Sequence, residues 1–159
     1  MISKQTKNKV VIVIFLCVNF IFTSHSYAKN IVIFGDSLSA AFGMDLEKGW
    51  VHLLSESLKG QHSVHNASIS GETSAGAVAR ISLTLAEFKP DLLLLEIGAN
   101  DGLQGLPMSN MRTNLEKIIQ LSHAEGTQVA LVGISLPASY GSRYIDQFRS
   151  TFSELAEKH

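Results

Sequence analysis

The sequence predicts a doubly wound α/β domain, a flavodoxin-like parallel sheet in a three-layer α/β/α arrangement. Short apolar runs alternate along the chain with segments whose apolar residues recur at helical spacing. Some of these runs are almost continuously apolar, which is typical of parallel strands covered on both faces. The chain has 159 residues and a net charge of −1. This length suits one domain, and the charge provides no basic surface for binding nucleic acid.

The first half of the chain predicts two strands and two helices. Residues 31–34 form a short apolar run that stops at a glycine, so they are the first expected strand. Helical spacing follows from Trp50 to Leu58. Residues 63–67 are a second strand candidate. Thr73-Ser74 can cap the next helix, which stops before Pro90.

The second half continues the alternation. Residues 91–97 are an almost continuous apolar strand, and a helix is expected between Pro107 and Gly126. Residues 128–134 form the fourth strand, and residues 144–155 carry the apolar stripe of a last helix. Such a helix normally leads to a fifth strand, and the fourth strand is too apolar for an exposed sheet edge. We therefore expect residues 29–159 to be a C-terminally truncated domain lacking its last strand and C-terminal helix.

Residues 1–28 have the pattern of a secretory signal peptide. Three lysines precede an apolar run over residues 10–22, and small residues lead up to Ala28. A membrane-spanning helix needs about 20 apolar residues, so an uncleaved anchor is the weaker alternative. Cleavage is expected after Ala28, which places the protein in the periplasm or outside the cell, with no stable membrane span. The single cysteine, Cys17, lies in this leader, so the mature chain has no disulfide or cysteine metal site.

Three segments that follow the first three expected strands each contain a candidate functional residue. Ser37 follows the first strand, Gly71 the second and Asn100 the third. Because the carboxyl ends of parallel strands meet at one edge of the sheet, we expect these residues to converge. Ser37 can attack an acyl carbonyl, while the backbone N–H groups of Ser37 and Gly71 and the Asn100 amide can donate to the resulting oxyanion. These groups together could support attack on an acyl carbonyl without a cofactor.

Each of these residues also has a purely structural interpretation. A Gly-Asp-Ser sequence after a strand is often a turn with Asp36 as its cap, Gly71 alone is a turn glycine, and Asn100-Asp101-Gly102 alone is a tight turn. A loop that binds flavin or nucleotide phosphates would contain several glycines and, in nucleotide hydrolases, a lysine. Residues 35–40 contain one glycine and no lysine. The histidines are expected on the surface or against helices, and their spacing matches no metal site.

Four ordered blocks resemble the SGNH (GDSL) hydrolase family, in particular its bacterial periplasmic acyl-CoA thioesterase, lysophospholipase and arylesterase members. The blocks are Gly35-Asp36-Ser37-Leu38-Ser39-Ala40, residues 66–74, Gly98-Ala99-Asn100-Asp101-Gly102-Leu103 and Leu136-Pro137-Ala138-Ser139-Tyr140-Gly141. The resemblance implies the SGNH hydrolase fold, with Ser37 as nucleophile and Gly71 and Asn100 in the oxyanion hole. It also implies that Leu136, Pro137 and Tyr140 belong to a loop that borders the acyl-chain groove.

The general base of the family is missing from this chain. Members have an Asp-x-x-His element near the C-terminus, but none of the aspartates here has a histidine three residues later. Without a base, a serine hydroxyl is a weak nucleophile near neutral pH. We therefore expect a monomeric ester and thioester hydrolase that is impaired in this form. The alternative is a non-catalytic acyl-binding relative that keeps the oxyanion pocket.

Overall fold

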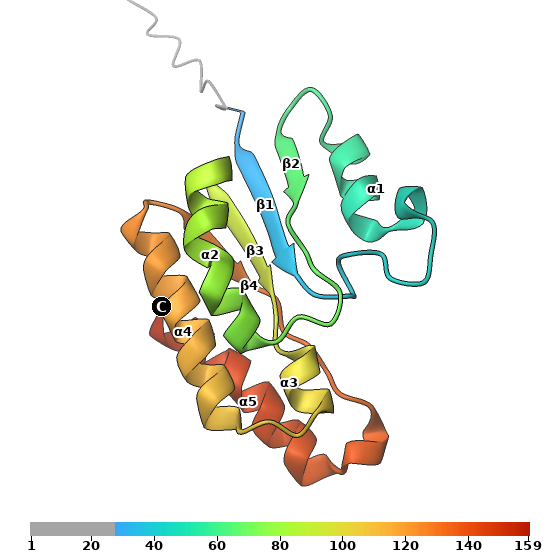
Figure 1. Cartoon of the computed structure of the whole chain (residues 1–159), viewed down its shortest axis with the longest axis vertical. Coiled ribbons are helices and arrows are strands. Elements are labelled where there is room, and N and C mark those ends of the chain that lie inside the picture. Colours follow the sequence, from blue (N-terminus) through green and yellow to red (C-terminus); the bar gives the residue numbers. More distant parts are fainter. Residues whose placement is uncertain (1–27) are drawn as a thin grey trace, which may run out of the picture.

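Four parallel strands form the centre of the domain (Figure 1). The structure, a computed structural model, describes residues 28–159, so the predicted signal peptide lies outside the described residues except for Ala28. The sheet has the order β2-β1-β3-β4, with parallel pairing throughout. Its strands are β1 (Asn30–Gly35), β2 (Ser63–Asn66), β3 (Leu92–Glu96) and β4 (Gln128–Leu131). The predicted doubly wound α/β fold is confirmed.

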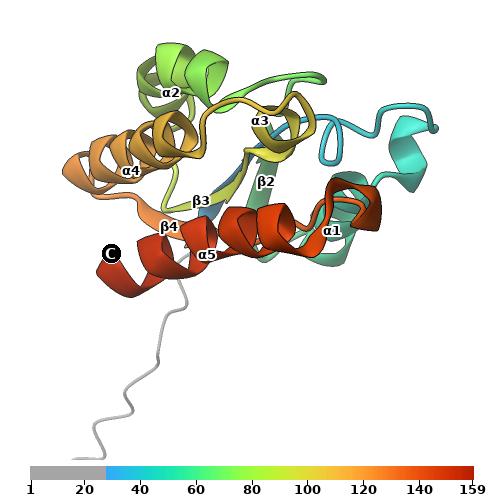
Figure 2. The ribbon, with the colours of Figure 1, turned by 90° about the horizontal axis from the view of Figure 1, so that it is seen from below.

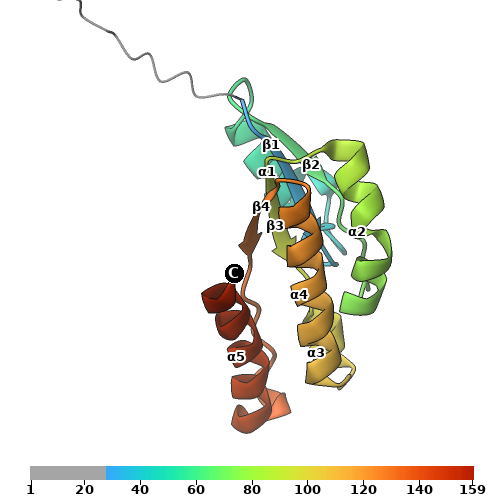
Figure 3. The ribbon, with the colours of Figure 1, turned by 90° about the vertical axis from the view of Figure 1, so that its left-hand side faces the viewer.

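Helices cover both faces of this sheet (Figure 2), with α2 and α4 over one face and α1 over the other. Helix α5 packs beside α4 (Figure 3). Among the described residues, no helix is both long and apolar enough to cross a membrane. The helices are α1 (Trp50–Ser57), α2 (Ser74–Phe88), α3 (Ala99–Leu103), α4 (Met108–Ala124) and α5 (Ser142–Lys158), with 3-10 turns η1 (Leu46–Lys48) and η2 (Ala138–Tyr140).

The alternation of side chains along β1 and β3 explains their continuous apolar sequences. Val32 and Phe34 of β1 point into the larger core formed with α2, α4 and α5, whereas Ile31 and Ile33 pack under α1. Leucines 92–95 of β3 divide between the two faces in the same way. Most residues of β1 and β3 are therefore buried, with Leu92 and Leu94 partly buried, which is the arrangement that the apolar runs predict.

The topology places a crevice between β1 and β3. From β1 the chain moves outward to β2, and then crosses to β3 on the other side of β1. The carboxyl ends of the strands on either side of such a reversal are where open α/β sheets bind ligands. Gly35 pairs with Glu96 at this edge, so the segments that contain Ser37 and Asn100 leave the sheet from adjacent positions.

Two predicted elements differ from the structure. The segment after β3 was predicted as a loop, but residues 99–103 form the short helix α3. The fourth strand was predicted over residues 128–134, but β4 ends at Leu131, which pairs with Leu95 of β3, the only partner strand of β4 among the described residues. One further ladder bond, from Val132 N to Leu95 O at 2.9 Å, closes the pairing.

Alanine substitutions at two helical glycines are expected to change the free energy of unfolding in opposite directions. A Cβ on Gly102 of α3 would lie 2.8 Å from Cε2 of Phe148 and 2.9 Å from both methyls of Leu136. Gly102→Ala is therefore expected to destabilise the fold by about 1–3 kcal/mol through overpacking. Gly76 of α2 has no such neighbour, the nearest atom being Glu72 Cγ at 3.4 Å. Gly76→Ala is expected to stabilise it by about 0.5–1 kcal/mol, because alanine favours the helix.

Urea unfolding of the two variants beside the parent measures both effects. If the urea midpoint of Gly102→Ala were equal to or higher than that of the parent, the close packing of α3 against α5 would be contradicted. The Gly76→Ala variant is the matched control, since it adds the same methyl group to a helix without crowding it.

Candidate active site

Ser37 lies in a hydrogen-bonded turn directly after β1. The Asp36 carbonyl accepts from Ser39 N at 3.3 Å and from Ala40 N at 2.9 Å. The Asp36 carboxylate accepts from Leu38 N at 3.0 Å, so Asp36 does cap the turn, as its structural interpretation predicts. The Ser37 side chain is half-buried, and its backbone N–H has no acceptor among residues 28–159. That N–H group is free to donate to a ligand.

A buried carboxyl group supports this turn from below. Glu96, at the end of β3, accepts from the Ser39 hydroxyl at 2.7 Å and from Asp36 N at 3.4 Å. Its second oxygen, Oε1, is buried with no hydrogen-bond partner. A Cβ on Gly35 would lie 2.7 Å from Glu96 Oε2 and 2.8 Å from the Ser39 side chain. Position 35 must therefore be glycine, so that the turn can approach the carboxyl group.

Gly71 lies in a tight turn after β2. Its φ of +79° is in the left-handed region, and Glu72 N donates to Ile69 O at 3.2 Å to close the turn. A glycine suits this position because of its backbone conformation, since nothing lies within 4 Å of an added Cβ. The exposed Gly71 N–H has no acceptor among the described residues. A second backbone donor at this edge is thus free.

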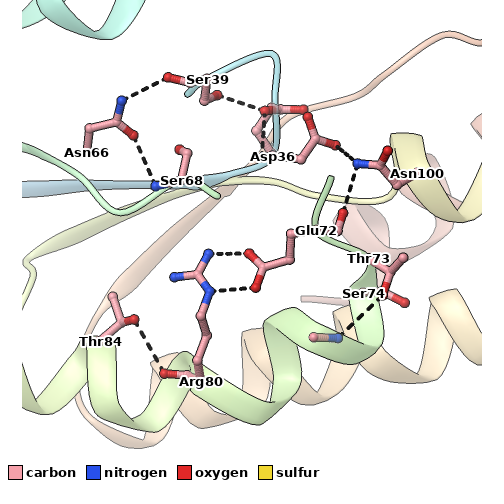
Figure 4. A network of polar contacts seen from close by, with 12 residues as sticks. Asp36, Ser39, Asn66, Ser68, Glu72, Thr73, Ser74, Arg80, Thr84 and Asn100 are labelled. Atoms are coloured by element: carbon pink, nitrogen blue, oxygen red, sulfur yellow. Dashed lines mark hydrogen bonds and ion pairs between the residues drawn. The ribbon is translucent and has the colours of Figure 1, made fainter. Parts of the chain in front are cut away.

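Asn100 links the segments of the other two residues. Its side-chain nitrogen donates to Glu72 O at 2.9 Å and to the Asp36 carboxylate at 3.3 Å (Figure 4). Glu72 follows Gly71, and Asp36 precedes Ser37. The structure therefore places all three predicted residues on segments joined by one hydrogen-bond network. The bond to Asp36 is the longer and weaker of the two.

Buried acids surround this network, and their charges are compensated in different ways. Glu72 forms an ion pair with Arg80 (Figure 4). The Arg80 guanidinium also lies 3.9 Å above the ring centre of Phe34. The Asp101 carboxylate accepts from Ser74 N at 2.7 Å and from Ser74 Oγ at 2.6 Å, which fixes the start of α2 to α3. Burial raises the pKa of Asp36, against the hydrogen bond from Leu38 N, and the nearby acids raise it further.

Glu96 has the largest change in ionisation. Burial raises its pKa from 4.5 to about 7, although the Ser39 hydrogen bond opposes the shift. The protonated form is therefore substantially populated near neutral pH, which reduces the negative charge beneath the Ser37 turn. Less negative charge at this position favours an oxyanion nearby.

This ionisation predicts a pH-dependent stability. The folded protein holds a proton on Glu96 that the unfolded chain releases above about pH 4.5, so stability falls as the pH rises to about 7. The loss attributable to this carboxyl group is about 3 kcal/mol. Glu96→Gln keeps an acceptor for Ser39 and cannot ionise, so its free energy of unfolding should lack this slope.

Urea unfolding across this pH range measures the slope. Ser39→Ala is the companion variant, since losing the donor should raise the pKa of Glu96 and extend the slope to higher pH. A Glu96→Gln protein with the slope of the parent would contradict the assignment.

The histidines of the described residues do not hydrogen-bond to Ser37. His62 accepts from Lys29 N at 3.1 Å, His65 packs against Phe88, and His123 lies edge-on to His159. His52 is exposed on α1. Residues 28–159 also contain no cluster of three or more histidines, cysteines and acids placed to hold a metal ion. Within the described part of the chain, Ser37 therefore has no imidazole base.

The three residues expected at the acyl-chain groove are in different environments. Leu136 is buried and packs against Gly102, so it contributes to the core rather than to an open surface. Pro137 and Tyr140 are exposed, and the Tyr140 hydroxyl donates to Leu103 O at 3.0 Å. This bond ties the segment after β4 to the end of α3, close in sequence to Asn100.

Sequence reasoning missed the acids that support the site. Glu96 stands alone as a charged residue in an apolar strand, and this signal could have identified it. Arg80 stands among the apolar residues of α2, and its partner Glu72 lies eight positions earlier, just before the helix begins. The contact between Asp101 and Ser74 joins segments far apart in the sequence, and no local pattern indicates it.

Comparison with known proteins identifies relatives over most of the chain. A family model described as the GDSL-like lipase/acylhydrolase family matches residues 33–159. Esterase TesA of Pseudomonas aeruginosa PAO1 is 44% identical over 137 residues, which are 84% of this chain and 68% of TesA. An arylesterase of Vibrio mimicus is 40% identical over 149 residues, 92% of this chain and 73% of that protein.

A further relative and a solved structure agree with this result. Thioesterase 1/protease 1/lysophospholipase L1 of Escherichia coli K12 is 38% identical over 131 residues, which cover 82% of this chain but only 63% of that protein. The crystal structure of TesA superposes with a TM-score of 0.78 and 46% identity, covering 80% of this chain and 73% of TesA.

Proposed function

Because this chain belongs to the GDSL-like lipase/acylhydrolase family, we propose that it is built to hydrolyse acyl esters and thioesters through an acyl-Ser37 intermediate. The observation that supports this most directly is the joined network of the three segments, with free N–H groups at Ser37 and Gly71. No cofactor is required. The relatives named arylesterase, thioesterase and lysophospholipase indicate the range of leaving groups.

In this mechanism the Ser37 oxygen bonds to the acyl carbon while a base removes its proton. The carbonyl oxygen becomes negative and accepts hydrogen bonds from Ser37 N, Gly71 N and the Asn100 amide. Collapse of the tetrahedral intermediate releases the alcohol or thiol, which takes up the proton. Water then attacks the acyl-Ser37 ester by the same route and releases the carboxylic acid. The step for which residues 29–159 offer no group is the removal of the proton.

A trapping experiment tests the nucleophile. With imidazole as an added base, a p-nitrophenyl alkylphosphonate should form a covalent adduct on Ser37, located by peptide mass spectrometry. Ser37→Ala should abolish the adduct. Ser70→Ala is the matched control, since Ser70 is an exposed serine in the neighbouring turn. An adduct on another residue, or a yield unchanged in Ser37→Ala, would contradict the proposal.

A non-catalytic acyl-binding role is the second candidate, favoured by one observation. None of the histidines among residues 28–159 hydrogen-bonds to Ser37, so the free N–H groups could hold an acyl group that is not turned over. The nucleotide sequence beyond codon 159 separates the two roles. A reading frame that continues into an Asp-x-x-His segment supports the hydrolase, and a stop codon there supports the binding protein.

We also propose that residues 1–28 are removed on export. Cleavage after Ala28 would leave Lys29 as the new N-terminus, one residue before β1. Its backbone nitrogen already donates to His62 Nδ1 at 3.1 Å. N-terminal sequencing of the exported protein should begin at Lys29, and a sequence that begins at Met1 would show that the leader is retained.

A further inference from the structure

Exposed apolar side chains are concentrated in the segment that follows Ser37. Leu38, Phe42, Met44 and Leu46 are 58, 76, 55 and 72% exposed, and together we call them the loop patch. Surface apolar residues are normally scattered singly, and contiguous groups mark contact sites. The exposure of four such residues within nine positions therefore calls for a functional explanation.

The backbone that presents the loop patch is ordered. Phe42 N donates to Ser37 O at 3.3 Å and Met44 N to Ala41 O at 3.2 Å, while Lys48 N and Gly49 N close η1. The Asn66 side chain anchors the segment by donating to Ser39 O at 2.8 Å. Hydrogen bonds therefore fix the loop backbone in a conformation that exposes the apolar side chains.

This loop also contains local strain. Ala41 has a φ of 57°, a left-handed conformation that is unfavourable for a residue with a Cβ. Its Cβ lies close to Gly49, where an added Cβ would be 2.8 Å away, so the two ends of the loop are pressed together. Strain that persists beside a functional residue is typical of segments whose shape serves binding.

The loop patch is part of a wider apolar edge around the candidate site. Ile69 lies two residues before Gly71, and Leu103 ends α3 three residues after Asn100. Both are exposed. Of the large exposed apolar residues in the described part of the chain, Leu83 on α2 alone lies away from residues 38–53 and from the segments after β2, β3 and β4. Within residues 28–159, most of the large exposed apolar residues therefore belong to the loop that follows β1 or to segments that follow the other strands.

The charges of the loop restrict what can cover it. Residues 37–50 contain Asp45, Glu47 and Lys48, of which Asp45 and Lys48 form an ion pair of 2.8 Å. The remaining formal charge is negative, so the loop offers no attraction to an anionic surface. A zwitterionic surface with accessible hydrocarbon fits both the side chains and the charge.

We propose that the loop patch docks on the surface of zwitterionic lipid aggregates and so presents Ser37 to acyl chains at the interface. The inference rests on the proposed function for the identity of the reacting group, but docking itself does not require turnover. Burying Phe42 and Met44 in the acyl boundary removes their side chains from water, which is the driving force for such interfacial binding.

Vesicle binding tests the proposal. The exported protein from Lys29 onward should bind phosphatidylcholine vesicles in flotation, with a blue shift from Trp50, the single tryptophan, which begins α1 beside the loop. The double variant Phe42→Ser/Met44→Ser should bind at least about tenfold more weakly, because both side chains lose their apolar contact with the lipid. Leu83→Ser, which changes an equally exposed residue on α2, should bind as the parent does. Phosphatidylglycerol in the vesicles should not strengthen binding.

Ser37→Ala should bind vesicles like the parent, so docking and chemistry are measured separately. Vesicle binding that depends on the loop patch, without a Ser37 adduct, would uphold docking and refute the proposed hydrolase. An adduct without vesicle binding would do the reverse. Docking is overturned if the parent protein does not bind vesicles, or if the Phe42→Ser/Met44→Ser variant binds them as tightly as the parent. It is also overturned if light scattering shows that the parent is a dimer and that these substitutions dissociate it. Circular dichroism of each variant confirms that the comparison is between folded proteins.

Discussion

Residues 29–159 are expected to hydrolyse p-nitrophenyl acetate about 10⁶-fold more slowly than TesA of Pseudomonas aeruginosa in the same assay, because removing the histidine of a serine triad costs about that factor. The proposed oxyanion donors, Ser37 N, Gly71 N and the Asn100 amide, remain in this chain, so a residual rate of about 10³–10⁴ over water is expected. A spectrophotometric assay at high protein concentration measures both rates. A Ser37-dependent rate within about tenfold of TesA would show that another group of this chain acts as the base.

Added imidazole tests whether removal of the Ser37 proton is the step that limits the rate. Neutral imidazole can take the position of the absent side chain, so the rate should rise with its concentration. The rise should disappear in Ser37→Ala and persist in Ser70→Ala. Imidazole also cleaves such esters in solution, and the Ser37→Ala protein provides that background. An equal rise in both variants would mean that Ser37 is not the nucleophile.

Asn100→Ala is expected to lower the imidazole-supported, Ser37-dependent rate by about 10²–10³, the usual effect of losing one oxyanion donor. The same change removes the hydrogen bonds to Glu72 O and to Asp36, so some loss of stability should accompany it. The kinetic loss should greatly exceed the loss of stability, because the donor acts mainly in the transition state.

Asn114→Ala is the matched control for this variant. Asn114 donates to Ser74 Oγ at 3.0 Å and supports the contact between α2 and α3 without reaching the Ser37 turn. We expect its kcat/KM to stay within about threefold of the parent, because it makes no contact with the reacting atoms. If Asn100→Ala and Asn114→Ala lowered the rate equally, Asn100 would be a positioning residue rather than a donor to the oxyanion.

The fold was predictable because its strands and helices have strong periodic signals. Leu92–Glu96 and Asn30–Gly35 have side chains packed on both faces of the sheet and are mostly buried, which their apolar sequences indicate directly. The short helix α3 was missed because its five residues include a glycine and an asparagine, which are common in turns. Its helical form depends on packing of Gly102 against Phe148 and Leu136, a contact between distant segments.

The candidate site was predictable only in part. Ser37, Gly71 and Asn100 follow successive strands, so topology alone places them at one edge. The acids around them depend on burial and on pairing across the sheet, which a local pattern does not reveal. Leu136 stays a prediction for the acyl-chain groove, and in the described residues its side chain is buried.

The close approach of Gly35 to Glu96 means that these two positions cannot vary independently. A methyl group at residue 35 collides with the carboxyl group beneath it, so the first letter of the Gly-Asp-Ser motif reflects steric exclusion as well as chemistry. Shortening the acid would remove the shorter of the two contacts that an alanine at residue 35 would make, and the contact with the Ser39 side chain at 2.8 Å would remain. In a designed or naturally divergent version of this domain, the two substitutions should therefore be tolerated as a pair more readily than the alanine alone.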